Sequence, residues 1–532
     1  MQKNVLEYLQ ASAARFPDKP AFTDEHEVIT FAELERRGRS LGTYIAAHTQ
    51  DVRENGFNLY PEQPPLCINR PVAVLVERSA ATIAAFMGVL YSGNYYVPIE
   101  SKMPAARIAE ILRQLEPVAL IYTQDAPSEE LIGLFRCARN DDNTTPFPVL
   151  SAQEGFLFPP DNTLLEKRLQ GILDIDPVYV KFTSGSTGTP KGIVISHSAV
   201  IDFTDWMGDT FPFSEADVMA NQAPFYFDLS VKDVYTTLKF GATTHIIPKK
   251  LFMFPIKLLE FIRDKNTTAL IWATAAFNLV ANSGALAKIA PAGLNKIILG
   301  GEALFAKQLN IWRAALPNVA YVNLYGPTEV TVDCTYYKID REYGDHEAIP
   351  IGYPCANKGV MLLDEDLQPV PQGQPGEICV RGVGLARGYY GDPAKTAAVF
   401  IQNPLNPWYP DVIYRTGDIG MLNDEGLYMY LCRRDGQIKR GGYRIELGEI
   451  ETALSALPQM RELACFFDAD KDKIVCAYDG DMDADAIITG LRDTIPKYMH
   501  PNVFRKMTNL PHNANGKIDR VKLKDDYFNG TD

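Results

Sequence analysis

Short apolar runs alternate with helical patterns in the N-terminal part of the chain. Residues 72–76 read Val-Ala-Val-Leu-Val, which has the length and composition of a buried strand, and residues 80–91 continue as an apolar helix. A second strand-like run follows at residues 95–99. Strand, helix and strand at this spacing predict parallel strands joined by a right-handed crossover.

The same alternation resumes in the middle of the chain. It predicts strands at residues 243–247, 269–274, 296–299 and 319–324, and a helix at residues 258–265. In sheets of this kind, ligands bind beyond the carboxyl ends of the strands. Polar residues that directly follow these runs are therefore the first candidates for a site.

The pattern changes after residue 349, where short strands at residues 359–364 and 376–381 are separated by Gly and Pro turns. This texture predicts a small β subdomain. A charged stretch at residues 433–442 comes next. The remaining part of the chain, roughly one hundred residues, has the pattern of a compact αβ unit.

At 532 residues the chain is longer than one hydrophobic core usually spans, and its composition, 46% hydrophobic and 22% charged, is that of an ordinary globular protein. We therefore predict an α/β fold with two domains. Residues 1–434 would form a large N-terminal domain of layered α/β sheets plus the β subdomain, and residues 435–532 a small α+β C-terminal domain.

Composition and charge argue against several classes of protein. No apolar run approaches the about 18 residues of a membrane-spanning helix, and residues 1–16 have the pattern of an amphipathic helix rather than of a signal peptide. A net charge of -14 without a basic stripe disfavours a nucleic-acid surface. The eight cysteines are scattered and suit reduced thiols. We expect a soluble, cytoplasmic protein without membrane insertion or a nucleic-acid partner.

The most distinctive stretch, residues 179–197, reads YVKFTSGSTGTPKGIVISH. Its ten positions from Thr183 to Gly192 hold five hydroxyl residues, three glycines, one proline and one lysine. Small residues let the backbone approach a polyphosphate, hydroxyls donate hydrogen bonds, and Lys191 adds a positive charge. The stretch is not the loop of P-loop NTPases, because only two residues separate Gly185 from Gly188. A surface turn is less favoured, since strand-like runs flank the loop on both sides.

Three further motifs carry candidate chemistry. Residues 323–329 read NLYGPTE and offer an aromatic ring for a purine and a carboxylate for Mg²⁺. In residues 414–418, YRTGD, Asp418 follows a glycine turn, where a carboxylate can accept both hydroxyls of a ribose. Residues 513–520, NANGKIDR, present Lys517 on another glycine turn. Taken singly, the first and third motifs are better explained as surface turns that carry a solvated charge, and the second is weak evidence because Gly-Asp turns are common.

Together, the motifs resemble those of the adenylate-forming enzymes, in particular the amino-acid adenylation domains of nonribosomal peptide synthesis. The matches run in the family's order from Thr30 to Arg520. The resemblance implies ATP and Mg²⁺ as cofactors and a two-step reaction, in which an aminoacyl adenylate forms with release of pyrophosphate and then acylates a phosphopantetheine thiol. It also implies that the C-terminal domain is mobile and turns about a hinge at Asp435.

The resemblance further assigns roles to residues of the nucleotide site. Tyr325 would stack on adenine, Asn323 would read the base, and Asp418 and Arg433 would contact the ribose. The implied catalytic residues are Thr328, Glu329, which is also the metal ligand, and Lys517. The implied ATP-binding set is Thr183, Ser184, Gly185, Ser186, Thr187, Gly188, Lys191, Gly300, Gly301, Glu302, Asn323, Tyr325, Gly326, Thr328, Asp418 and Arg433.

Asp228, in the segment FYFDLSVK at residues 225–232, bears on the substrate. A carboxylate in an apolar segment needs a cationic partner, which a structural Lys or Arg would also supply. In the resembling enzymes this Asp binds the α-ammonium group of an amino acid, and relatives that act on aryl or fatty acids lack it. The pocket positions carried over are Asp228, Leu229, Lys232, Ala276, Ile298, Gly300, Leu324, Val332, Asp333 and Lys517.

Lys232 and Asp333 leave two substrate classes open. The pocket set is similar to that of glutamate-activating domains, from which it departs at Leu229, Ala276 and Leu324, and Lys232 would then pair with the substrate's side-chain carboxylate. Alternatively, Lys232 and Asp333 neutralise each other and leave a small pocket for alanine or serine. The Phe-Asp-Leu-Ser-Val segment also resembles that of D-alanine:carrier-protein ligases. Of these, L-glutamate is favoured.

Partners follow from the end of the chain, which stops about a dozen residues after Arg520 without a Gly-Gly-x-Ser attachment site. We expect a separate phosphopantetheinylated carrier protein, and the need for a small MbtH-like activator is left open. The sequence departs from the family at Arg440-Gly441, where an apolar-Arg pair is common. The alternatives are an acyl-CoA synthetase that uses free CoA, which Asp228 argues against, and a non-catalytic nucleotide-binding protein.

Overall fold

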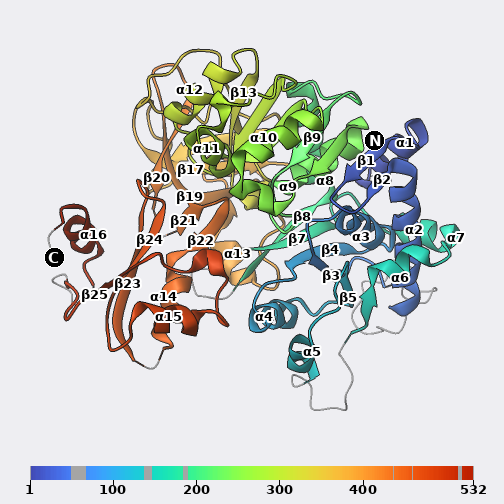
Figure 1. The fold of residues 1–532 in the computed structure, drawn as a ribbon, viewed down its shortest axis with the longest axis horizontal. Helices are drawn as coiled ribbons and strands as arrows, with labels where there is room; N and C mark the ends of the chain where they lie inside the picture. The colour runs from blue at the N-terminus through green and yellow to red at the C-terminus, as the bar shows by residue number, and fades with distance from the viewer. Residues whose placement is uncertain are drawn as a thin grey trace.

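The computed structural model describes residues 2–49, 67–136, 147–183, 190–434, 437–457, 459–512 and 518–530. Figure 1 shows two large sheets with helices packed on and between them, and the C-terminal elements gathered at one side. The predicted α/β fold of layered sheets with a smaller C-terminal unit is therefore confirmed.

One layer is a six-stranded sheet of order β6-β5-β3-β4-β7-β8, parallel except for β8, which runs antiparallel to β7. Its strands are β3 (Pro71–Val76), β4 (Tyr95–Glu100), β5 (Ala119–Tyr122), β6 (Val149–Ser151), β7 (Pro177–Thr183) and β8 (Lys191–Ser196). The helices in this part of the chain are α3 (Ala80–Tyr91), α4 (Ala105–Leu115), α5 (Glu129–Arg136), α6 (Ala152–Leu157) and α7 (Asn162–Gln170).

The second layer is a nine-stranded sheet of order β15-β14-β13-β12-β11-β9-β10-β1-β2, whose central strands are parallel. Its strands are β1 (Pro20–Thr23), β2 (Val28–Thr30), β9 (Val218–Asn221), β10 (Thr243–Ile246), β11 (Ala269–Ala273), β12 (Lys296–Gly300), β13 (Ala320–Tyr325), β14 (Thr335–Lys338) and β15 (Tyr353–Pro354). Its helices are α1 (Leu6–Arg15), α2 (Phe31–His48), α8 (His197–Thr210), α9 (Ser230–Phe240), α10 (Pro255–Asp264), α11 (Thr274–Asn282) and α12 (Ala306–Ala315), with single turns η1 (Lys249–Met253), η2 (Ala285–Ala287) and η3 (Thr328–Val330).

Helix α3 shows how the two layers are joined. Every one of its residues is buried, as its apolar sequence predicts for a helix covered on all sides. Glycines let α2 and α3 approach closely: a Cβ at Gly42 would lie 2.8 Å from the Cβ of Tyr91, and one at Gly88 would lie 2.6 Å from Leu41. The side chain of Thr30 accepts a hydrogen bond from the backbone N–H of Glu33 and so begins α2.

The β subdomain is a five-stranded antiparallel sheet of order β16-β17-β19-β18, with β20 paired to β19. Its elements are β16 (Lys358–Leu363), β17 (Gly376–Gly382), α13 (Pro393–Val399), β18 (Phe400–Gln402), β19 (Val412–Leu422) and β20 (Tyr428–Arg433). The predicted strands at residues 359–364 and 376–381 correspond to β16 and β17, and the subdomain extends as far as β20.

The C-terminal elements pack around apolar clusters of their own. They are β21 (Gln437–Arg440), β22 (Tyr443–Glu446), α14 (Leu447–Ser455), β23 (Met460–Asp468), β24 (Lys473–Gly480), α15 (Ala484–Leu491), η4 (Lys497–Met499), β25 (Val503–Lys506) and α16 (Arg520–Phe528). The predicted domain boundary falls at residues 435–436, which lie outside the described residues, so it stays a prediction.

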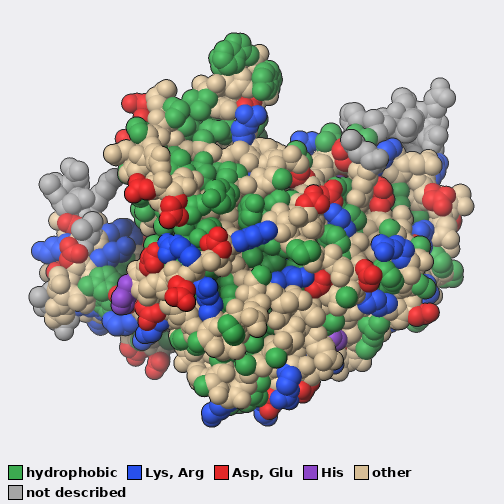
Figure 2. Space-filling model, turned by 90° about the horizontal axis from the view of Figure 1, so that it is seen from above, with side chains coloured by type: hydrophobic (Ala, Val, Ile, Leu, Met, Phe, Trp, Pro, Cys, Tyr) green, Lys and Arg blue, Asp and Glu red, His purple; other side chains and the backbone are tan. Residues whose placement is uncertain are grey.

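On the face shown in Figure 2, Lys and Arg side chains are interspersed with Asp and Glu side chains. In the part of the chain that the structure describes, no helix is both long and apolar enough to cross a bilayer.

Candidate functional site

Tyr325, at the carboxyl end of β13, connects the nine-stranded sheet to the β subdomain. Its hydroxyl donates to Oδ2 of Asp418 on β19 at 2.6 Å, and the guanidinium of Arg433 on β20 lies 2.9 Å from Oδ1 of the same carboxylate. Three residues predicted for the adenosine part of the nucleotide are thus brought together. The side chain of Asn323 instead donates to the carbonyl of Pro350 at 2.8 Å.

Glu329, in the single turn η3, is fully buried and surrounded by donors. Its Oε1 accepts a hydrogen bond from the hydroxyl of Tyr389 at 2.8 Å and lies 3.5 Å from Nζ of Lys191, and its Oε2 lies 2.6 Å from the guanidinium of Arg444. Burial alone would raise the pKa of this carboxyl, but the charges of Arg444 and Lys191 hold the pKa well below its usual range. Glu329 is therefore ionised, and its carboxylate oxygens can act as metal ligands.

Mg²⁺ commonly binds through one or two carboxylates together with substrate phosphates, which fits an ionised and buried Glu329. Within the described ranges, no group of three or more His, Cys, Asp or Glu side chains could hold a metal ion by itself. A single carboxylate such as that of Glu329 suits a metal that enters the site bound to the phosphates of a nucleotide.

The ends of the predicted phosphate loop are held by the antiparallel pair of β7 and β8, in which Thr183 lies opposite Lys191. Burial and the nearby charge of Arg444 lower the pKa of Lys191 to about 8. The hydroxyl oxygen of Thr183 is buried and has no hydrogen-bond partner among the described residues, so it is available to a phosphate. Ser184 to Gly188 lie outside the described residues.

The hairpin of β21 and β22 reaches the same place from the C-terminal elements. Besides the contact of Arg444 with Glu329, the backbone N–H of Gly442 donates to Oε1 of Glu302 at 2.7 Å, and Nζ of Lys439 lies 5.6 Å from the centroid of the Tyr325 ring. Sequence reasoning did not place Arg444 or Lys439 in the site. Both residues belong to the charged run that follows residue 435. This run shows that they are charged, but it has no pattern that reveals which distant residue each of them contacts.

The departure at Arg440-Gly441 has a local explanation. Gly441 and Gly442 form the two-residue loop between β21 and β22, and both have positive φ, 60° and 83°, a conformation that glycine adopts most easily. The side chain of Arg440 turns toward the carbonyls of Asp472 and Tyr498, so it packs on the C-terminal elements.

Lys517 and Asp435, like Ser184 to Gly188, lie outside the described residues. In the described orientation the β21–β22 hairpin faces the large sheets, whereas α16 lies at the outer edge of the C-terminal elements (Figure 1).

The predicted amino-acid pocket contains a buried ion pair. Nζ of Lys232 on α9 lies 2.8 Å from Oδ2 of Asp333, and both side chains are almost fully buried. Gly300, at the end of β12, packs against this pair, because a Cβ there would lie 3.3 Å from Oδ1 of Asp333 and 3.4 Å from the Cβ of Leu324. The mutual neutralisation that was left open as an alternative is therefore the arrangement in this structure.

The other predicted pocket residues lie nearby to different degrees. A Cβ at Gly301 would lie 3.3 Å from the side chain of Leu229, and Asp228 is half-buried one residue before it. Val332 is buried one residue before Asp333. Ala276 and Ile298 belong to the hydrophobic cores of the large sheet.

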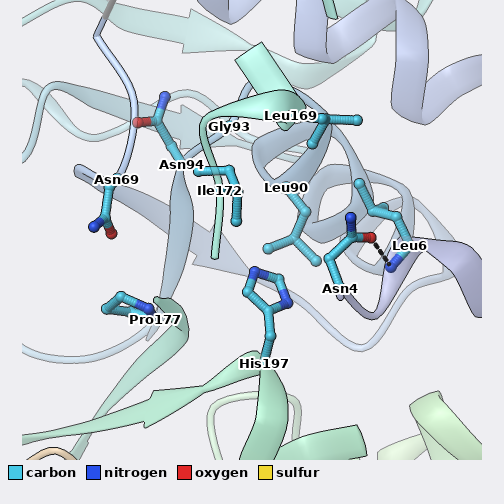
Figure 3. A pocket seen from close by; sticks show the side chains of 10 residues that line it. All are labelled: Asn4, Leu6, Asn69, Leu90, Gly93, Asn94, Leu169, Ile172, Pro177 and His197. Carbon is cyan, nitrogen blue, oxygen red and sulfur yellow. Dashed lines mark hydrogen bonds between the residues drawn. The ribbon is translucent and has the colours of Figure 1, made fainter. Parts of the chain in front are cut away.

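A small cavity lies apart from these residues, beside His197 at the start of α8 (Figure 3). Its volume of about 10 Å³ has room for roughly one water molecule. Nδ1 of His197 accepts a hydrogen bond from the backbone N–H of Val5, and burial lowers the pKa of the imidazole to about 3, so the ring is neutral. This cavity is a packing feature and not a candidate substrate site.

Comparisons with known proteins bear on the whole chain. Residues 9–390 match the family model described as AMP-binding enzyme. The chain is 32% identical over 531 residues to tyrocidine synthase 3 of Brevibacillus parabrevis, covering 98% of this chain but 8% of that protein. It therefore spans less than a tenth of the length of this relative.

Solved structures share the fold, and two of them illustrate the likeness. The Vibrio cholerae adenylation domain AlmE, in complex with glycyl-adenosine-5'-phosphate, is similar with a TM-score of 0.81 and 22% identity over 99% of this chain and 98% of that chain. Holo-PA1221, an NRPS protein that contains adenylation and PCP domains, is similar with a TM-score of 0.79 and 24% identity over 98% of this chain and 84% of that chain.

Proposed function

We propose, from the premise that this chain belongs to the AMP-binding enzyme family as an adenylating ligase of the nonribosomal peptide synthetase type, that it activates an amino acid with ATP and transfers it to a carrier protein. The acceptor would be the phosphopantetheine thiol of a separate protein. A cytoplasmic location, where ATP is supplied and thiols stay reduced, belongs to the same proposal.

One observation carries the proposal. Two buried carboxylates, Glu329 in η3 and Asp418 on β19, are each held by a cation, and Lys439 lies over the ring of Tyr325, whose hydroxyl donates to Asp418. Such an arrangement suits a ligand that has a metal-bound polyphosphate at one end and a ribose at the other. We refer to Lys191, Tyr325, Glu329, Asp418 and Arg433 as the nucleotide side of the site.

In the first step, the carboxylate of the amino acid would attack the α-phosphorus of ATP, and pyrophosphate would leave. Lys191 and the hydroxyl of Thr183 would bind phosphate oxygens, and Thr328 would donate to the α-phosphate. Mg²⁺ held by Glu329 would neutralise charge on the phosphates. Lys517 would bridge the substrate carboxylate and the α-phosphate, an assignment that rests on the resemblance.

In the second step, rotation about Asp435 would replace the Lys517 segment with the β21–β22 hairpin, and the thiol would then displace AMP. The contacts of Arg444 with Glu329 and of Gly442 with Glu302 support an assignment of the described orientation to this step. The PCP domain of the similar protein PA1221 supports a carrier as acceptor.

The buried ion pair bears on the choice of amino acid. The pattern of pocket residues favours L-glutamate, but Lys232 already has Asp333 as its partner, and a second carboxylate would approach the buried negative charge of Asp333. The geometry therefore supports a small neutral amino acid, such as alanine of either hand or serine, ahead of glutamate. The glycyl adenylate bound by the similar domain AlmE points in the same direction.

Amino-acid-dependent ATP/pyrophosphate exchange tests the proposal, with L-Glu, L-Asp, L-Ser and both alanines as substrates. Lys517→Ala should suppress exchange by about 10²-fold or more, because a cation that stabilises the transition state is lost. Lys524→Ala, which changes an exposed lysine of α16, is the matched control and should leave exchange unchanged. Unchanged exchange in Lys517→Ala would end the assignment of this lysine.

Two rival functions remain distinct in the same assays. An acyl-CoA synthetase would form its product with free CoA, so product analysis with CoA against a carrier protein separates the two. A protein that binds nucleotide without turnover with any amino acid would revive the non-catalytic alternative. Exchange with and without a small MbtH-like protein would show whether an activator is needed.

A further inference from the structure

Two short segments carry pocket residues, and each is held by a buried lysine that the pattern of pocket positions does not include. The first segment, residues 227–230, carries Asp228 and Leu229, and the second, residues 330–333, carries Val332 and Asp333. The Lys232–Asp333 ion pair joins the second segment to α9, which begins at Ser230 of the first segment. We call these two segments the amino-acid side of the site.

Lys358, at the start of β16, holds the second segment. Its Nζ donates to the backbone carbonyls of Val330 at 2.7 Å, Thr331 at 3.3 Å and Asp333 at 2.5 Å. An ammonium group has three N–H donors, so this loop takes all of them. The side chain is 7% exposed and its Nζ also faces the ring of Phe203 at 5.2 Å, so its charge is directed into the protein.

The segment that Lys358 holds has an unusual backbone. Thr331 and Val332 have φ values of 59° and 69°, and β-branched residues are rarely found in this left-handed region. The loop is also tight, because a Cβ at Gly326 would lie 2.4 Å from the Cα of Asp333. A single cation that donates to three carbonyls of such a loop offsets its strain and fixes the direction of the Asp333 side chain.

Lys181, on β7, holds the first segment in a similar way. Its side chain is 2% exposed, and its Nζ donates to the carbonyl of Phe227 and, at 3.1 Å, to the hydroxyl of Ser230. These two groups bracket Asp228 in the chain. Burial lowers the pKa of Lys181 to about 7, while the charge of Asp228 acts in the opposite direction.

We propose that Lys181 and Lys358 are positioning residues that set the shape of the amino-acid pocket through the backbone of its two walls. Substrate selectivity then depends on two cations that act through Asp228, Val332 and Asp333 rather than only on the residues that line the pocket. This inference rests on the proposed activation of an amino acid.

Steady-state exchange kinetics of Lys358→Met and Lys181→Met in the 532-residue chain test the inference. A displacement of the walls should raise the KM for the amino acid by about tenfold and should reduce the preference for alanine or serine over larger amino acids. The KM for ATP should stay within about twofold, because the nucleotide side is left intact. A merely structural role would alter both KM values or neither.

Lys296→Met is the matched control. Nζ of Lys296 also donates to a carbonyl, that of Pro212 at 3.0 Å, pairs with Asp217 at 2.8 Å and faces the ring of Phe213 at 4.5 Å, but it lies at the opposite end of β12 from Gly300. Equal loss of thermal stability in Lys296→Met and Lys358→Met, with selectivity changed only in the latter, is the expected result.

Selectivity that stays unchanged in both Lys181→Met and Lys358→Met would overturn the inference, although the proposed function would stand. If the wild type shows no exchange with any amino acid, the proposed function itself fails. If Lys358→Met does not fold, Lys358→Gln, which keeps two N–H donors, takes its place. The KM for the amino acid is again compared with the KM for ATP, and nucleotide binding shows whether the variant is folded.

Discussion

On the nucleotide side of the site, Glu329 is paired with Arg444 from the C-terminal elements, whereas on the amino-acid side the charges of Lys232, Lys181 and Lys358 all find partners in the N-terminal part of the chain. Both sides contain buried ions. They differ in that Arg444, the partner of Glu329, belongs to the elements that we propose to move, whereas the partners on the amino-acid side do not.

This difference separates two tasks. A carboxylate that must exchange a protein cation for a metal and phosphates benefits from a partner that can be withdrawn, because the desolvated charge is then paired in both states. A pocket that must distinguish similar substrate side chains benefits from ion-pair and hydrogen-bond partners that do not move. Its shape is then the same before and after the C-terminal elements rotate. The predictions below test this division.

The largest effect is expected for Glu329→Gln. Loss of the buried anion removes the proposed metal ligand, so amino-acid-dependent ATP/pyrophosphate exchange should fall by about 10²–10³-fold. Asp217→Asn, which neutralises a buried carboxylate paired with Lys296, is the control for loss of charge away from the site. Exchange that survives in Glu329→Gln would mean that the nucleotide side has been misassigned.

Arg444→Met tests whether the ion pair between Arg444 of the C-terminal elements and Glu329 serves the second step, the acylation of the carrier. Because Arg444 contacts Glu329 in the described orientation, its loss should slow acylation of the carrier by about tenfold and leave exchange nearly unchanged. Arg461→Met removes an exposed arginine that pairs with Asp479 and Asp481 in the same lobe and should have no effect. A parallel loss of exchange and acylation in Arg444→Met would contradict the division.

Asp333→Asn should alter substrate choice. Neutralising Asp333 leaves the cation of Lys232 buried without its partner, so a glutamate side chain should become a better ligand and alanine a poorer one. We expect the ratio of kcat/KM for glutamate to that for alanine to rise by about tenfold. A ratio that stays constant would show that Lys232 does not face the substrate.

The smallest effect concerns pH. The pKa of Lys181 is lowered in the folded protein to about 7 from an ordinary value of 10.5, so the unfolded chain binds more protons between these values and stability should rise with pH across this window. Relative to Lys181→Met, the wild type should gain up to about 1.4 kcal/mol for each pH unit above 7. Thermal unfolding of both proteins at pH 6 to 9 measures the difference, and parallel curves would mean that Lys181 titrates normally.

Local pattern was sufficient for most of the fold. The apolar run at residues 80–91 predicted α3 with its observed bounds, and the strand at residues 72–76 differs from β3 by one residue. Motifs that are contiguous in sequence likewise singled out Lys191, Glu329 and Asp418 as candidates, since a glycine turn or a strand end depends on a few neighbouring residues.

The sequence by itself therefore determined the layered α/β architecture and the positions of the candidate nucleotide residues. The tertiary structure decided the pairing of charges: Lys232 with Asp333 across 101 positions, Arg444 with Glu329 across 115, and Lys358 with the strained loop at Val332. A local pattern fixes whether a residue is helical, extended or buried, because those properties depend on adjacent residues. Which cation meets which carboxylate depends instead on how distant elements pack, and no periodicity in the chain encodes that choice.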